Sequence, residues 1–250
     1  MAKITLLAEF INLLMENKMK IFAISDLHLS NSCDKPMDVF GGHWENYTEK
    51  IKENWNRKVS DEDIVLVAGD ISWAMKLDEA KADLEWIDEL PGKKIIIKGN
   101  HEYWWKSISG VRAILPESIQ AIQNDAIKLD GVIICGTRGW TVPEPDKEFL
   151  PEDEKIYKRE VERLKLTLMF AKQLQTNGEK LICMMHFPPH NAQNEQSDFM
   201  TLFEEFGVSD VVFGHLHGYT NCKKHEVING INYYFTSCDH IGNDPVLIHE

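Results

Sequence analysis

Short, continuous apolar runs rich in β-branched residues recur along the chain and limit its fold more than any other feature. Runs of this kind are typical of strands covered on both faces, since a strand with one exposed face would alternate apolar and polar residues. The runs cover 20–25, 63–69, 93–99, 131–137, 180–186, 210–215, 231–237 and 246–249. The sequence therefore predicts several strands buried inside a layered domain.

Amphipathic segments lie between several of these runs. Residues 44–58, 78–90 and 152–176 have helical periodicity, and Pro91 with Gly92 would stop the second of them. In the longest segment the apolar residues that define one helical face are Val161, Leu164, Leu168 and Ala171. Alternating strands and helices predict an α/β fold. The late runs have less helix between them, which suggests a second sheet packed on the first.

The 250 residues fit one large domain, and no linker divides them. The fold is expected to begin at Met19, so the predicted domain covers 19–250. Residues 1–18 contain an apolar stretch, but Glu9 and Asn12 interrupt it and no small-residue cleavage site follows, so an amphipathic helix is favoured over a signal peptide. We interpret 1–18 as an N-terminal accessory helix or an upstream extension.

Polar side chains that would disrupt a strand interior follow five of the apolar runs directly. Because ligand sites in α/β sheets form beyond the carboxyl ends of strands, these side chains are expected to meet at one edge. They are Asp26 and His28, Asp70, Asn100 and His101, His186, and His215 and His217.

The residue types at this edge are those that bind a pair of divalent cations. Carboxylate, imidazole and amide groups suit Mn, Fe, Zn and similar ions without any thiolate. Asp70 is the natural bridge, because its carboxylate has two oxygens to share. Gly69, Gly99 and Gly214 precede Asp70, Asn100 and His215, and would let the backbone approach closely. Each tripeptide alone is weak, but five pieces in one order after predicted strands are specific.

The order of these pieces, DLH, GD, GNHE, a lone His and GHLH, resembles the calcineurin-like metallophosphoesterase superfamily over residues 19 to about 240. The likeness is strongest to small bacterial phosphoesterases of unassigned substrate. It implies an α/β fold of four layers, α/β/β/α, in which a two-sheet β-sandwich is flanked by helices. It also implies two divalent metal ions per chain.

The resemblance also implies a role for each residue of the motifs. Asp26, His28 and His217 would hold one ion, Asn100, His186 and His215 would hold the other, and Asp70 would bridge both. His101 would be catalytic rather than a ligand, standing beside the phosphate as general acid or charge stabiliser. Asn100 and His101 would also contact the substrate.

One position departs from the superfamily pattern. The stretch after Asp70 reads GDISWA, so that Trp73 stands where an Asp usually orients the histidine equivalent to His101. Asp26, Asp78 or Glu102 could take over that role. The departure also weighs against a close match to Ser/Thr protein phosphatases.

Other residues have two open interpretations. Arg138 follows the run at 131–137 and could bind phosphate through its forked guanidinium or form a surface salt bridge. His43 could line the substrate mouth, although an exposed loop histidine is the simpler interpretation. The aromatic run 103–105 could wall a pocket, but packing is favoured for it and for His190 and His240.

Composition limits the partners and the compartment. The chain has 27 basic and 40 acidic residues, net charge −13, which makes duplex nucleic acid an unattractive partner and leaves a small phosphorylated substrate open. No apolar run approaches the length of a membrane span. Five cysteines, an odd number without a CxxC pair, are expected to be reduced thiols in the cytoplasm. Oligomeric state is not constrained.

These observations predict metal-dependent hydrolysis of a phosphomonoester or phosphodiester by water activated at a dinuclear site. The alternative is a non-catalytic metal-binding scaffold or a protein-interaction module on the same fold. A degraded site should have lost ligands, whereas all seven ligand positions match the pattern here.

Overall fold

Each apolar run of the sequence forms a strand, and the strands divide between two sheets. The structure, a computed structural model, describes residues 19–218 and 223–250. One sheet has the strand order β11-β1-β2-β3-β4 and the other β5-β6-β7-β8-β10-β9. The strands are β1 (Ile21–Ile24), β2 (Ile64–Val67), β3 (Lys93–Ile97), β4 (Ile119–Ile122), β5 (Asp125–Lys128), β6 (Val132–Thr137), β7 (Lys180–Met185), β8 (Asp210–Phe213), β9 (His225–Ile228), β10 (Ile231–Phe235) and β11 (Val246–His249).

Three strands were not expected from the sequence. Strand β4 pairs parallel to β3, whereas β5 and β9 pair antiparallel to β6 and β10. Each of the three lies at the edge of its sheet. Edge strands carry fewer apolar residues than central ones, which is why β5 (DAIK) and β9 (HEVI) do not form apolar runs in the sequence.

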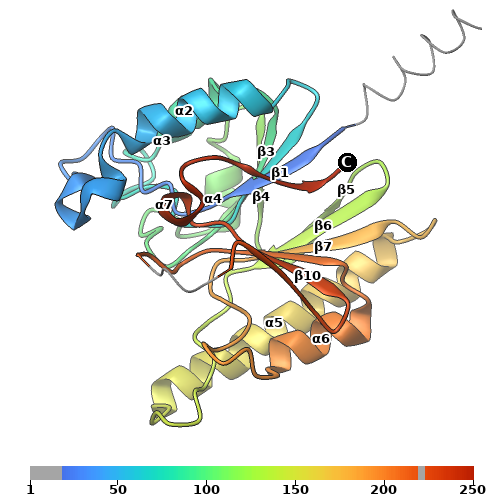
Figure 1. Ribbon diagram of the computed structural model, residues 1–250. Coiled ribbons are helices and arrows are strands. Elements are labelled where there is room, and N and C mark those ends of the chain that lie inside the picture. Colours follow the sequence, from blue (N-terminus) through green and yellow to red (C-terminus); the bar gives the residue numbers. More distant parts are fainter. Residues whose placement is uncertain (1–18, 219–222) are drawn as a thin grey trace, which may run out of the picture.

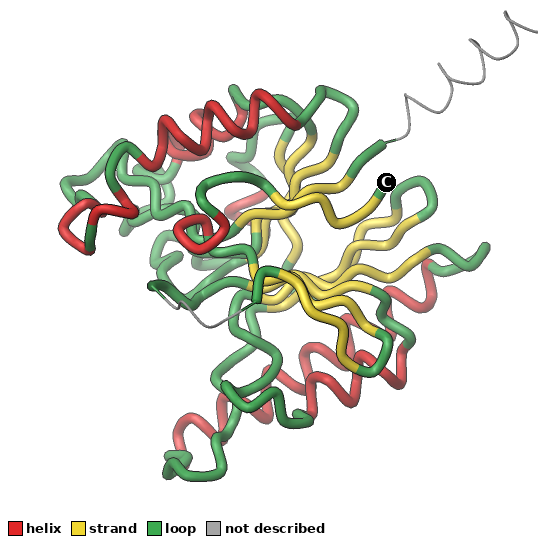
Figure 2. The backbone as a smooth tube through the Cα atoms, viewed as in Figure 1, coloured by secondary structure: helices red, strands yellow, loops and turns green. Residues whose placement is uncertain are grey.

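The central strands are apolar throughout because both of their faces are buried. On β1, Ile21 and Ala23 belong to the core between the two sheets, whereas Phe22 and Ile24 face the helices outside. On β7, Ile182 and Met184 point between the sheets. Figure 2 shows the two groups of strands facing each other, with helices on the outer sides. The predicted two-sheet sandwich is thereby confirmed.

Helices complete the outer layers. α2 (Tyr47–Lys58), α3 (Lys81–Asp88), α4 (Ile108–Arg112) and α7 (Cys238–Ile241) contribute to the core outside the first sheet, with the 3₁₀ turns η1 (Met37–Phe40) and η2 (Gly42–Trp44) beside them. α5 (Pro151–Leu174) and α6 (Asp198–Phe206) pack against the second sheet. Figure 1 shows α2 and α3 on one side of the sandwich and α5 and α6 on the other. The four-layer α/β/β/α order is therefore correct.

The three helices expected from the sequence are present, with adjusted ends. In α5, Leu164, Leu168 and Ala171 are fully buried, and Val161 packs partly buried beside them. α2 begins later than expected because Asn46, with φ 50°, has left-handed backbone just before it. α6 was not expected, although Ser197 caps it by accepting from Met200 N and Gly207 ends it in left-handed geometry.

The N-terminal segment, membrane-spanning potential and the cysteines complete the description of the chain. The accessory helix at 1–18 lies outside the described residues. In 19–218 and 223–250, no helix combines the length and apolarity needed to span a membrane. Among the cysteines in these ranges, Cys135, Cys183 and Cys238 are buried free thiols and Cys33 is a half-buried one.

Candidate metal centre

The two sheets meet at one end of the sandwich, where the polar residues of the motifs gather. Ser25, at the end of β1, donates its N–H to the carbonyl of Thr236 beyond β10 at 2.9 Å. Loops after β1, β2 and β3 come from the first sheet, and loops after β7 and β8 come from the second. All eight motif residues lie in these five loops, as the sequence predicts.

The backbone at this end is strained. Asp26, His28, Asp70 and His215 all have left-handed φ angles, of 59°, 43°, 51° and 74°. Such geometry costs energy in residues with a side chain and concentrates at functional sites. It is fixed by hydrogen bonds between loops: Asp26 N donates to Gly69 O at 2.9 Å and His28 N to Asp70 O at 3.0 Å. The strain thus coincides with four of the seven predicted ligands.

Close backbone approach explains all three glycines noted in the sequence. A Cβ on Gly99 would collide with the Asp70 carboxylate, a Cβ on Gly214 with the Asp26 carboxylate, and a Cβ on Gly69 with the His186 ring and the Gly99 backbone. Any other residue would push a predicted ligand out of place. The three glycines are therefore required by the site itself.

Asp26, His28 and His217 form one group of candidate ligands, which we call the first ligand group. His28 Nε2 lies 3.1 Å from His217 Nε2, which lies 3.5 Å from Asp26 Oδ1. Asp26 is held by Ser25 Oγ and by Ser237 Oγ, which donates at 2.8 Å. Its carboxylate also accepts the His215 N–H at 3.0 Å.

Asp70, His186 and His215 form the second ligand group, and Asn100 joins them. Asn100 Oδ1 lies 2.7 Å from His186 Nε2 and 2.9 Å from His215 Nδ1. Asp70 Oδ2 lies 3.4 Å from His186 Nε2 and 3.8 Å from His28 Nε2. The Asp70 carboxylate therefore stands between the two groups.

The Nε2 atoms of His186 and His217 point into the two ligand groups, as the ligands of a cation would. His186 Nδ1 contacts the carbonyl of Ala68 at 3.0 Å, and His217 Nδ1 contacts Asp239 Oδ1 at 3.1 Å. A carbonyl or carboxylate only accepts, so each Nδ1 carries hydrogen, and a proton on Nε2 is the one that a bound cation would replace. Each Nε2 faces a further acceptor, Asn100 Oδ1 or Asp26 Oδ1. Imidazole nitrogens, carboxylates and an amide oxygen that converge in this way fit a cation in each group.

Burial and charge shift the pKa values in opposite directions. Burial lowers the pKa of His28 and of His215 to about 3, so both rings are neutral and available as ligands. Burial also acts to lower the pKa of His186, but the Asp70 carboxylate, with Asp26 and Glu102, raises it to about 9. Although burial opposes it, the charge of His186 holds the pKa of Asp70 well below its usual range.

Glu102 organises the loops beneath the second ligand group. Its carboxylate is fully buried and accepts the backbone N–H groups of Gly99, Asp70 and Ile71. It therefore ties the loop after β2 to the loop after β3. Burial, together with the neighbouring Asp70, raises the pKa of Glu102 to about 7. Glu102 thus positions backbone and does not orient the His101 ring.

His101 lies at the rim of the site, with 31% of its side chain exposed, and its Nε2 is 3.9 Å from Asp70 Oδ2. Its Nδ1 is buried and has no hydrogen-bond partner among the described residues. Asp26 bonds elsewhere and Asp78 is exposed, so the suggested carboxylate substitutes do not hold this ring. Trp73 packs against it instead, with ring centroids 4.5 Å apart, and stacks on His28 at 4.8 Å.

Arg138 is engaged outside the two ligand groups. Its guanidinium lies 3.7 Å from the buried carboxylate of Glu160 and 4.7 Å over the Trp140 ring. Its carbonyl accepts the N–H groups of His186 and Phe187. Arg138 is thus adjacent to the site through its backbone, while its side chain pairs with a buried carboxylate and not in the surface salt bridge of the alternative interpretation.

The remaining residues fall mostly into packing roles. Trp104 and Trp105 are buried in the core, and Tyr103 is 43% exposed with its ring 6.0 Å from His101. His43 is exposed, yet its Nε2 lies 3.8 Å from Asp239 Oδ2. His240 packs on Phe235 at 4.5 Å.

Asp239 was missed by sequence reasoning. It contacts His217 Nδ1 and accepts the Gly218 N–H at 3.0 Å, and so holds the exposed end of the first ligand group. The available signal was its place just after the apolar run 231–237, the same position that marks the other site residues.

Comparison with solved structures reveals proteins of the same fold at low identity. One is a protein of unknown function from Aquifex aeolicus, with a TM-score of 0.50, 15% identity, and coverage of 92% of this chain and 96% of that one. Another is the phosphopantetheinyl hydrolase of Mycobacterium tuberculosis, with a TM-score of 0.53, 14% identity, and coverage of 88% and 90%.

Sequence comparison assigns the chain more directly. An uncharacterized protein of Methanocaldococcus jannaschii is 32% identical over 88 residues, which are 33% of this chain and 47% of that protein. The chain therefore matches about half the length of this curated relative. The model of the family described as calcineurin-like phosphoesterase matches residues 19–219. With this match and the two-sheet fold, the chain belongs to the calcineurin-like phosphoesterase family.

Proposed function

We propose that the chain hydrolyses phosphate esters with two divalent cations, one in each ligand group, bridged by Asp70. The observation that carries the proposal is the inward convergence of acceptors from both groups, with Asp70 Oδ2 between His186 at 3.4 Å and His28 at 3.8 Å. Membership of a phosphoesterase family supports the same reaction class.

The ligands assigned are Asp26, His28 and His217 for one cation and Asn100, His186 and His215 for the other. When bound, a cation pair of this kind lowers the pKa of water and neutralises charge on phosphate oxygens. The chain's own contribution is to fix the ligands before substrate arrives. Ala68 and Asp239 set the tautomers of His186 and His217, and Glu102 holds the loops that carry Asp70 and Asn100.

His101 is assigned as the residue that meets the leaving group. Its Nε2 is at the rim of the site, where it can donate a proton to the departing oxygen or stabilise charge there. Trp73 limits the motion of the ring by packing, in place of a hydrogen-bonded carboxylate. Asn100 is assigned a contact with the substrate. Arg138 is assigned one too, and for this contact its guanidinium must leave Glu160 and bind a phosphate oxygen.

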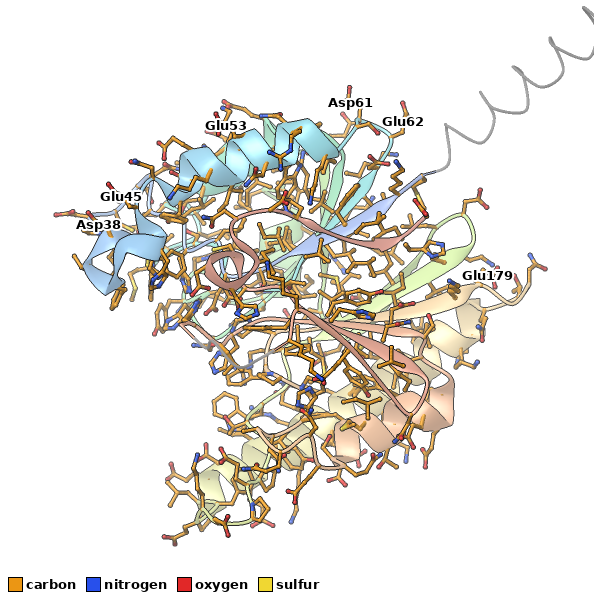
Figure 3. All side chains as sticks on the ribbon, in the orientation of Figure 1. Asp38, Glu45, Glu53, Asp61, Glu62 and Glu179 are labelled. Atoms are coloured by element: carbon orange, nitrogen blue, oxygen red, sulfur yellow. The ribbon has the colours of Figure 1, made fainter. Side chains whose placement is uncertain are left out.

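The substrate is proposed to be a small phosphorylated molecule, and the compartment to be the cytoplasm. Exposed carboxylates spread over the helical side of the first sheet, where Figure 3 labels Asp38, Glu45, Glu53, Asp61 and Glu62. With a net charge of −13, this surface repels duplex nucleic acid. The reduced cysteines support a reducing compartment.

A substrate screen on reconstituted protein tests the proposal. Metal-free protein receives Mn²⁺, Zn²⁺, Fe²⁺ or Ni²⁺ and is assayed on phosphomonoesters and phosphodiesters. Hydrolysis that returns with metal is expected, and it should be lost in His186→Gln but kept in His225→Gln, a histidine remote from both groups. Tight binding of two ions with no turnover on any ester would favour the scaffold alternative.

A further inference from the structure

A cavity of about 500 Å³ opens beside the second ligand group and reaches away from it. His215 and Phe187 stand at its inner end, with ring centroids 4.1 Å apart. The cavity continues between the loop at 141–147, the loop at 187–194 and the start of β9. Because it begins at a predicted metal ligand, a phosphate ester bound at the centre can extend its alcohol portion into it.

The lining combines apolar walls with buried polar groups. Val142, Phe187 and Phe213 supply buried apolar surface. His190 and Asn191 are also buried, at 8% and 7% exposure. This volume and mixture match sites for small organic molecules, which use few polar groups to fix orientation.

The polar groups of the lining are arranged to accept hydrogen bonds. His190 Nδ1 contacts the carbonyl of Asn191 at 3.0 Å, which selects the tautomer with hydrogen on Nδ1, and in that tautomer Nε2 is an acceptor. This Nε2 is buried and has no partner among the described residues. Glu226 Oε1 lies 4.0 Å away from it, beyond hydrogen-bond distance.

Asn194 Nδ2 donates to the two carboxylate oxygens of Glu226 at 3.4 and 3.3 Å, whereas no described residue donates to His190 Nε2, which lies 4.0 Å from Glu226 Oε1. A ligand donor placed between the two acceptors would fill this gap. An amino group has two hydrogens and can give one to His190 Nε2 and one to Glu226. The two lysines that line the cavity both face carboxylates. Lys147 Nζ donates to Glu144 Oε1 at 2.8 Å, and Lys223 Nζ lies 3.9 Å from Glu226 Oε2. The cavity therefore does not favour a second anionic group.

We propose that this cavity binds the leaving alcohol of the substrate, and that this alcohol has a flat or apolar body with an amino or amide N–H₂ group donated to His190 and Glu226. The inference rests on the proposed phosphoesterase function for its link to the centre. It narrows the substrate class to phosphate esters of amino-bearing, nucleoside-sized alcohols, and excludes simple sugar phosphates and phosphoproteins.

Binding to the metal-free full chain tests the cavity without any need for turnover. The probes are two matched pairs that differ only in the amino group, 3-aminoquinoline with quinoline and adenosine with purine riboside, followed by calorimetry. The amino member of at least one pair should bind about tenfold more tightly, the effect of one hydrogen bond to a charged or buried acceptor. Absence of binding, or equal binding within both pairs, would overturn the proposal.

Three variants locate the effect in the cavity. Ala192→Trp, at an exposed lining position, should abolish binding of every probe by filling the mouth. Glu226→Gln and His190→Phe should bring the members of each pair to similar affinity. Glu205→Gln, an exposed carboxylate outside the lining, should bind as wild type. Retained binding in Ala192→Trp, with an unchanged melting temperature, would place the ligand elsewhere.

Hydrolysis of adenosine 5′-phosphate and purine riboside 5′-phosphate by the metal-loaded chain separates this inference from the proposed function. A higher kcat/KM for the amino-bearing ester, lost in Glu226→Gln, supports both. Amino-selective binding without hydrolysis of any ester would keep the cavity and reject the function. If both esters were hydrolysed efficiently at equal kcat/KM, and the paired probes also bound equally, the proposed role of the cavity would be rejected and the phosphoesterase function would stand.

Discussion

The two ligand groups face each other across Asp70, yet they are held by different means. In the first group His28 is enclosed by aromatic rings, with Trp73 stacked at 4.8 Å and Trp44 at 5.9 Å, and His217 is partly exposed. In the second group His186 is fully buried and bonded to the backbone of Ala68. The comparison teaches that His186 is fixed by a hydrogen bond in the interior, while His28 depends on aromatic packing and His217 on one carboxylate at the rim.

This difference has a consequence for exchange of ions. His217 is partly exposed and held by one carboxylate, so its ring can rotate away from a cation at a lower free-energy cost than the ring of His186, which has no access to solvent. We therefore expect the first group to release its cation more readily.

Asp70→Asn should have the largest effect, because Asp70 belongs to both groups. The amide keeps one good acceptor oxygen and loses the charge, so hydrolysis should fall to background and both cations should bind more weakly. Elemental analysis and turnover measure this. Asp78→Asn, an exposed carboxylate in the loop that follows, is the control and should behave as wild type. Near-normal turnover in Asp70→Asn would refute the bridging role.

His101→Ala should separate chemistry from metal binding. Both groups should keep their cations, while turnover of an ester with a poor alkoxide leaving group falls roughly 10²–10⁴-fold, the usual worth of a positioned acid. A p-nitrophenyl ester should lose much less, since its leaving group needs little proton assistance. Equal losses of turnover for the two esters would favour charge stabilisation over proton donation. Loss of a cation from the variant would show that His101 is a metal ligand.

Asp239→Asn should weaken the first group alone. The amide can turn its N–H₂ toward His217 and no longer enforces the tautomer with hydrogen on Nδ1, which should lower affinity for one cation about 10–100-fold. Titration against a chelator should show one site weakened and the other unchanged. Asp244→Asn, whose carboxylate pairs with Arg57 and Lys58 at the surface, is the matched control. Equal weakening of both sites would contradict independent support of the groups.

The pH dependence of metal uptake by the second group should follow the proton of His186. In the metal-free fold the pKa of His186 is raised from 6.5 to about 9, so its proton stabilises the fold below pH 6.5 and that stability is lost as pH rises through 9. A cation must displace this proton, and affinity of the second group should therefore rise up to about tenfold per pH unit between 6.5 and 9.

Calorimetry in buffers of different ionisation enthalpy measures the protons released. About one proton should leave His186 per cation at neutral pH. His28, with its pKa lowered to about 3, contributes none. No proton release from the second group would show that His186 is already neutral before the cation binds.

The sequence was a good guide to the parts of the fold that burial alone determines. Continuous apolar runs correctly predicted eight strands, and the polar residues after them converge at one end of the sandwich as expected. Strands β5 and β9 were missed because an edge strand with one exposed face has no continuous apolar run. Helix α6 was missed although Ser197 and Gly207 mark both of its ends.

At the site, sequence could predict which residue types gather but not how each is held. Glu102 was considered as a partner for His101, but the structure directs its carboxylate to four backbone N–H groups. Trp73 could be identified as a departure from the family pattern, whereas its packing on both His28 and His101 depends on the fold. Asp239 belongs to no motif, and its role follows from the approach of α7, which follows β10, to the loop after β8. The ligand assignments stay predictions.

The convergence of five loops from two sheets means that the centre lies on the seam of the sandwich. Asp26, Asp70 and Asn100 come from the first sheet, and His186 and His215 come from the second. Cations held by both sets would cross-link the sheets, so that separating the layers would require releasing the ions. At a free concentration 100 times the dissociation constant, one such ion adds about 2.7 kcal/mol to the free energy of unfolding. The lifetime of the folded chain would then depend on the metal supply of the cell.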